Sequence, residues 1–153
     1  MDVNKLTQKS QEAIQNAQNI AVRYGQVELD IEHLLLALLE QPDGLIPRIL
    51  ARMDVPVDSL TAEVQKDIDR RPKVSGPGAE AGKVYVTQRF GRVLVKAKEE
   101  AARLKDEYVS VEHLLFGMID EGTGVPAGRI LAQFNITKER VLQALTAIRG
   151  NQR

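Results

Sequence analysis

Apolar residues near the start of the chain recur at spacings of three and four, which is the pattern of an amphipathic helix with one buried face. That face comprises Leu6, Ala13, Ile14, Ala17, Ala21 and Tyr24. The hydroxyl of Thr7 is suited to cap the start of such a helix, and Gly25 is suited to end it. The pattern therefore predicts a first helix between Thr7 and Gly25.

The same pattern occurs a second time in the later half of the chain, at a constant offset in residue number. Thr7-Gln8 recurs as Thr87-Gln88, and the sequence Glu-His-Leu-Leu at residues 32–35 recurs at residues 112–115. From residue 49 onward the offset is larger by one, which predicts one inserted residue between positions 122 and 128. Two copies of one unit therefore fill almost the whole chain.

Each copy also carries signals for three further helices. Asp30 and Ser110 are good N-caps for the second helices, whose first turns hold Glu32 and Glu112, where the helix dipole favours a carboxylate. Short third helices are expected to end near residues 53 and 134, and fourth helices to cover residues 57–70 and 137–149. The prediction is an all-α chain of two four-helix repeats, residues 6–71 and 86–149.

The segment between the repeats, residues 72–85, is rich in Pro and Gly and is predicted to be a linker. Strand-like alternation occurs at residues 83–86, but this run is too short to support a sheet.

Composition narrows the classes of function. The chain has 153 residues, with 21 Lys+Arg, 21 Asp+Glu and a formal net charge of zero, whereas a nucleic-acid partner would require a basic face. The absence of cysteine excludes thiolate zinc sites and disulfides. The sequence shows no signal peptide and no apolar run long enough for a bilayer, so we expect a cytoplasmic protein with no membrane partner.

Motifs for catalysis are incomplete. Gly82-Lys83 could end a phosphate-binding loop, but Pro77 stands where that loop needs glycine and Val84 where it needs a hydroxyl. Neither Glu-His pair is followed by the second histidine of a zinc protease, and no Gly-x-Ser-x-Gly sequence occurs. We therefore predict no catalytic residue, no metal site and no cofactor in this chain.

The polar residues of the repeats are expected to have structural roles. His33 and His113 should be partly buried in first turns, bonded to a neighbouring backbone or cap group, and titration near pH 6.5 would make the domain mildly acid-sensitive. Carboxylates that are expected on solvated surfaces are Glu99, Glu100, Asp106 and Glu107.

Because no catalytic or metal site is predicted, we expect the chain to act through a binding surface. Two helical units packed together leave a seam, and repeat proteins commonly bind partners along such seams. Val93 and Leu94 are candidates to line the seam, although adjacent helical residues cannot face the same direction. The alternative is that both residues belong to the ordinary core.

The tandem pattern resembles the double Clp repeat at the N-terminus of the Clp AAA+ unfoldases, and among these it is most similar to the ClpB disaggregases. The resemblance rests on Leu6-Thr7 with the following helix, on the Glu-His-Leu-Leu segments after Asp30 and Ser110, and on residues 148–153. It implies eight helices in two four-helix repeats related by a pseudo-two-fold axis. Residues 1–149 would form this domain, and residues 150–153 would begin a linker to ATPase modules that use ATP and Mg.

The resemblance also implies a function. The domain would capture unfolded or aggregated polypeptide for a homohexameric ATPase ring, in the stress response and together with the DnaK chaperone system, while the isolated domain would be a monomer. Family positions that affect substrate handling correspond to Thr7, Asp106 and Glu112 here. Thr7 is also suited to be an N-cap, and Glu112 to be a first-turn carboxylate.

One departure separates the related families. ClpC-type domains carry a threonine before the glutamate at both sites, where it helps to form pockets for phosphorylated arginine, but this chain has Ile31 and Val111. The difference favours the ClpB type. The alternative is an adaptor-docking domain of a ClpC- or ClpA-type unfoldase that serves a protease.

Overall fold

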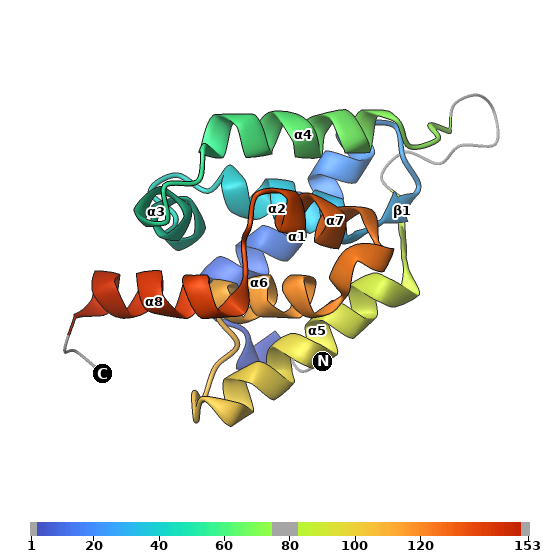
Figure 1. Cartoon of the computed structure of the whole chain (residues 1–153). Helices are drawn as coiled ribbons and strands as arrows, with labels where there is room; N and C mark the ends of the chain where they lie inside the picture. Colours follow the sequence, from blue (N-terminus) through green and yellow to red (C-terminus); the bar gives the residue numbers. More distant parts are fainter. Residues whose placement is uncertain (1–2, 75–82, 151–153) are drawn as a thin grey trace.

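The computed structural model describes residues 3–74 and 83–150, and in this part of the chain eight α-helices confirm the predicted all-α fold (Figure 1). The first repeat contains α1 (Gln8–Arg23), α2 (Ile31–Leu39), α3 (Leu45–Arg52) and α4 (Val57–Asp69). The second contains α5 (Gln88–Arg103), α6 (Val111–Asp120), α7 (Pro126–Gln133) and α8 (Lys138–Arg149). Shorter elements are the 3-10 helices η1 (Val3–Lys5) and η2 (Gly122–Gly124) and the strands β1 (Glu28–Leu29) and β2 (Tyr85–Val86). Most of the predicted linker, residues 75–82, and residues 151–153 lie outside the described residues.

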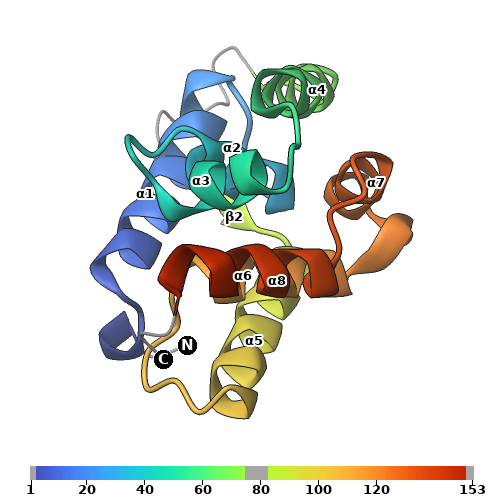
Figure 2. The same cartoon turned by 60° about the vertical axis from the view of Figure 1, so that its left-hand side comes forward.

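The contacts between helices follow the sequence repeat. α1 packs on α6 as α5 packs on α2, and α3 packs on α8 as α7 packs on α4, so each cross-repeat contact has a counterpart in which the repeats are exchanged. α2 and α6 lie between α4 and α5 in both views of the molecule (Figures 1 and 2). All nine residues of α2 are buried, as expected for a helix that is apolar on nearly every side. The two repeats therefore share one core.

Short backbone pairings also join the repeats. β1 pairs in parallel with β2, and Leu6 forms a parallel bridge with Val109. By the offset of the sequence repeat, Leu6 and Val109 are the counterparts of Val86 and Leu29, which are partners in the β1–β2 pairing. The expectation that residues 83–86 could not support a sheet was therefore incomplete, because the partner strand comes from the other repeat.

The inserted residue of the second repeat lies earlier than predicted. The N-caps of α2 and α6, Asp30 and Ser110, keep the same offset as the first helices, whereas the offset between their C-caps, Glu40 and Glu121, is already larger by one. The extra residue therefore lengthens α6 rather than the turn that follows it.

The prediction that Glu100 lies on a solvated surface is wrong, because its side chain is only 5% exposed. The ammonium group of Lys138 on α8 lies 2.6 Å from Glu100 Oε1, and Arg103 pairs with the same oxygen. A partner that is distant in sequence thus allows this carboxylate to be buried.

Candidate functional site

Two pockets lie at equivalent places in the two repeats, where the first helix of one repeat begins beside the second helix of the other. The backbone pairings create this arrangement: the Thr7 amide donates to the Val109 carbonyl at 3.0 Å, and the Thr87 amide donates to the Leu29 carbonyl at 3.1 Å. Thr7 is the N-cap of α1 and Thr87 the N-cap of α5. Each pocket therefore combines residues from both repeats.

The second helices, α2 and α6, start with a capping box in which histidine takes the usual place of Glu or Gln. His33 Nδ1 accepts a hydrogen bond from the Asp30 amide at 2.9 Å, and His113 Nδ1 accepts one from the Ser110 amide at 2.9 Å. Since Nδ1 accepts, Nε2 carries the proton in the neutral ring. It donates to Gln26 Oε1 at 2.7 Å from His33 and to Asp106 Oδ2 at 2.9 Å from His113. Both histidines thus bond cap groups, although they are fully rather than partly buried.

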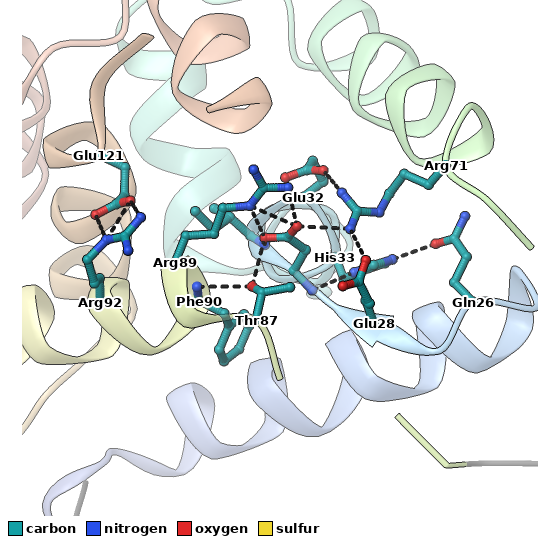
Figure 3. A network of polar contacts seen from close by, with 12 residues as sticks. Gln26, Glu28, Glu32, His33, Arg71, Thr87, Arg89, Phe90, Arg92 and Glu121 are labelled. Atoms are coloured by element: carbon teal, nitrogen blue, oxygen red, sulfur yellow. Dashed lines mark hydrogen bonds and ion pairs between the residues drawn. The ribbon is translucent and has the colours of Figure 1, made fainter. Parts of the chain in front are cut away.

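The first-repeat pocket has a volume of about 370 Å³. Ion pairs between residues of the chain lie at its base (Figure 3). The buried carboxylate of Asp30 accepts two hydrogen bonds of 2.9 Å from Arg89 Nε and one of 3.1 Å from the Thr87 hydroxyl. Arg71 Nη2 lies 2.9 Å from the same carboxylate. Burial raises the pKa of Asp30, but Arg89, the Ile31 amide and Arg71 outweigh this effect and lower that pKa to about 2.

Glu32 shares Arg71 with Asp30, and its side chain is 0% exposed. Arg71 Nη1 donates to Glu32 Oε2 at 2.6 Å, whereas Glu32 Oε1 is buried without a hydrogen-bond partner. Burial and the neighbouring charge of Asp30 raise the pKa of Glu32 to about 7 despite the attraction of Arg71. Burial and the positive charge of Arg71 lower the pKa of His33 to about 4, so titration of His33 near pH 6.5 is not expected.

These two shifts predict opposing effects of pH on stability. Glu32 has its pKa raised in the folded state, so the free energy of unfolding falls as pH rises from 4.5 to about 7. His33 has its pKa lowered, so the same free energy rises as pH rises from about 4 to 6.5. Urea unfolding should show a nearly flat profile between pH 4.5 and 6.5 for the native chain, and a rising profile for Glu32→Gln. Parallel profiles of the two proteins would contradict these assignments.

The second-repeat pocket has a volume of about 440 Å³. It is lined by Thr7, Asp106, Glu107, Tyr108, Ser110, Glu112, His113 and Arg149. Three of the five predicted binding residues, Thr7, Asp106 and Glu112, thus come together from both repeats. Sequence reasoning missed Arg149, whose Nη2 lies 2.6 Å from Glu112 Oε2.

Glu112 occupies the place that Glu32 occupies in the first repeat. Burial raises the pKa of Glu112, but the Ser110 hydroxyl and the Arg149 guanidinium outweigh it and hold the pKa below its usual value. The carboxylate of Glu112 is therefore ionised at neutral pH. Its Oε1 atom is buried and has no hydrogen-bond partner.

The other two predicted residues lie away from this pocket. Val93 on α5 is 0% exposed and packs against α6, where its carbonyl oxygen lies close to Gly117. Leu94 is partly buried against the same core. Neither residue lines either of the two pockets described above.

Two other kinds of site have no candidate within residues 3–74 and 83–150. No group of three or more His, Asp or Glu residues there is arranged to hold a metal ion. No helix in these ranges is both long and apolar enough to cross a bilayer.

Comparison with known proteins identifies the family. The model of the Clp repeat N-terminal domain matches residues 5–134, which include both capping boxes and both pockets apart from Arg149. The chain belongs to the Clp repeat N-terminal domain family. It is 46% identical over its whole length to the chaperone protein ClpB of Nitratidesulfovibrio vulgaris and 44% identical to that of Bacillus anthracis. It spans 18% and 17% of the lengths of these two relatives, and it resembles their N-terminal region.

Solved structures show the same fold. The N-terminal domain of Hsp104 from Candida albicans has a TM-score of 0.78 at 21% identity, with 97% of this chain and 94% of that one covered. The N-terminal domain of the ClpV1 ATPase from E. coli has a TM-score of 0.79 at 21% identity, with coverage of 95% and 85%. The Clp repeat fold is therefore retained in chains that share only about a fifth of their residues with this one.

Proposed function

We propose that the chain is the substrate-capturing N-terminal domain of a ClpB-type protein disaggregase. The observation that carries this proposal is the 46% identity with a chaperone protein ClpB over all 153 residues. In the whole protein, the domain would deliver unfolded or aggregated polypeptide to a hexameric ring whose modules use ATP and Mg, in the cytoplasm and together with the DnaK system. The domain itself would be a monomer joined to the ring by a linker.

The second-repeat pocket is the proposed site of capture. It is open and 440 Å³ in volume, and it gathers Thr7, Asp106 and Glu112 from two repeats. Tyr108 on its rim is 48% exposed and offers an apolar ring to a passing chain. A pocket of this size covers few residues, so we expect binding of micromolar affinity or weaker.

Two threonine variants can distinguish a role in binding from a role in helix capping. Thr7 Oγ1 accepts from the Ser10 amide at 3.2 Å, and Thr87 Oγ1 accepts from the Phe90 amide at 3.2 Å, so each residue caps its helix in the same way. Thr7→Ala should lower the free energy of unfolding by about 1 kcal/mol. Thr87→Ala should lower it further, because it also removes the hydroxyl that donates to the buried carboxylate of Asp30. Thr7→Ala alone should weaken binding of an unfolded protein, because Thr87 lies in the other pocket.

The measurement is a titration of the isotopically labelled chain with a permanently unfolded model protein, followed by amide chemical shifts. The proposal requires shifts that cluster at the N-termini of α1 and α6. Shifts at a different surface, caused only by a folded adaptor protein, would instead favour the adaptor-docking alternative. Equal loss of binding in the two threonine variants would refute the assignment of the pocket.

A further inference from the structure

The strand β2 pairs with β1 along one of its edges. The Tyr85 amide donates to the Val27 carbonyl at 2.6 Å, and the Thr87 amide donates to the other repeat in the same way. Because the backbone groups of successive strand residues point to opposite sides, the N–H and C=O of Val86 face away from β1. Within residues 3–74 and 83–150 neither group of Val86 has a hydrogen-bond partner, and β2 lies at the outer edge of the molecule (Figure 1).

The equivalent backbone groups of the first repeat are satisfied by the chain itself. Leu6 is the counterpart of Val86, and its amide donates to the Val3 carbonyl at 3.1 Å. The side-chain amide of Gln11 donates to the Leu6 carbonyl at 3.0 Å. The counterpart of Gln11 is Gly91, which has no side chain that could reach Val86. The two repeats thus differ in whether this edge is covered.

The surface beside the edge also differs between the repeats. Tyr85 and Val86 are 60% and 55% exposed, and Val95 on α5 is 58% exposed. The counterparts of Tyr85 and Val95 are Lys5 and Gln15, which are exposed polar residues. A lysine on a strand edge opposes the addition of a further strand, whereas valine and tyrosine favour it. The edge of β2 therefore combines an open donor and acceptor with apolar side chains that suit a strand.

We propose that this edge binds an extended, apolar segment of an unfolded polypeptide, which adds to β2 as a third strand through the N–H and C=O of Val86. The proposal rests on the proposed function and adds a second contact for the captured chain, apart from the second-repeat pocket. The occupant follows from the groups that are open: an unfolded chain offers unpaired backbone N–H and C=O groups, whereas a folded protein has paired nearly all of its own. Recognition through the backbone is also compatible with many different sequences.

The test uses a seven-residue peptide of alternating valine and threonine and an analogue that is N-methylated at every residue. Methylation keeps the side chains and removes the N–H donors. Each peptide is titrated into the isotopically labelled whole chain, and the Val86 amide is followed by its chemical shift and its hydrogen-exchange rate. The unmethylated peptide should shift this amide and slow its exchange, and the methylated analogue should bind about tenfold more weakly.

Gly91 provides a matched pair of variants. Gly91→Gln introduces the side chain that covers the equivalent carbonyl in the first repeat, and a Cβ atom at this position would meet nothing within 4 Å. The new amide should donate to the Val86 carbonyl and weaken binding of the unmethylated peptide about tenfold. Gly91→Ala adds a methyl group that cannot donate a hydrogen bond, so this variant should bind the peptide as the native chain does.

The outcomes distinguish this proposal from the proposed function. Equal affinity of the two peptides, or of the two Gly91 variants, would overturn recognition through the backbone of β2. A shift of the Val86 amide that grows with the concentration of the chain alone would assign the edge to a second copy and would also overturn it. Shifts confined to the second-repeat pocket would overturn it and leave the proposed function intact. If neither the peptide nor an unfolded protein shifts either surface, both proposals fail.

Discussion

The variant Asp30→Ser should lower the free energy of unfolding by about 3 kcal/mol at pH 7, because it leaves two arginines beside a buried position without their shared carboxylate. Asp30 is 0% exposed and pairs with both Arg71 and Arg89. Serine is the residue that caps the equivalent helix in the second repeat, so the N-cap itself is retained. The loss therefore reports the ion pairs rather than the cap. Chemical denaturation of both proteins provides the measurement.

The pH dependence of this difference gives a second check. The pKa of Asp30 is lowered to about 2 in the folded protein, so the stability that it contributes is present above its usual pKa of 3.8 and is lost as the pH falls toward 2. The difference between the native chain and Asp30→Ser should therefore become smaller below pH 4. A difference that stays constant down to pH 2 would contradict an electrostatic origin.

The second repeat suggests the control for this variant. It carries Ser110 and Lys9 where the first repeat carries Asp30 and Arg89. The double variant Asp30→Ser/Arg89→Lys should therefore recover part of the lost stability, because a lysine can extend its ammonium group into solvent as Lys9 does. If the double variant is no more stable than the single one, the unpaired Arg89 is not the cause of the loss.

The local signals in the sequence were sufficient for the helices but not for the charge clusters. Thr7, Asp30, Thr87 and Ser110 were predicted as caps because capping depends on residues within one turn. The arginines that neutralise the buried glutamates follow no such rule, since Arg71 lies 39 residues after Glu32 and Arg149 lies 37 residues after Glu112. Their pairing depends on how the fourth helix ends against the second, which no local pattern encodes.

Residues of the candidate site could be predicted only from the sequence repeat or from the family resemblance. Thr7, Asp106 and Glu112 came from the family resemblance, and the structure places them in one pocket. Val93 was proposed from an apolar stripe, which cannot distinguish a helix face that meets a partner from one that meets the core. A difference between the two pockets could have been predicted from the sequence repeat, because Arg89 of the second repeat corresponds to Lys9 of the first.

The close packing of α5 on α6 predicts a large effect of one methyl group. A Cβ atom at Gly117 on α6 would lie 2.6 Å from the Val93 carbonyl oxygen, 3.2 Å from Val93 Cγ1 and 3.3 Å from the Ala97 amide nitrogen on α5. Two of these atoms belong to helical backbone, so the methyl group can be accommodated only if α5 and α6 move apart. The first repeat has Ala37 at the equivalent position, opposite a helix with Ala13 where the second repeat has Val93. The second repeat thus combines a larger residue on one helix with glycine on the other.

Gly117→Ala should therefore destabilise the protein by about 3 kcal/mol, although alanine is the better helix former by about 1 kcal/mol. At this chain length such a loss corresponds to a decrease of roughly 10 °C in Tm, which thermal unfolding monitored by circular dichroism would detect. The matched control is Gly91→Ala on α5, where a Cβ atom would meet nothing within 4 Å. That variant should gain up to about 1 kcal/mol. If both substitutions stabilise the protein, α5 and α6 are not as closely packed as Gly117 indicates.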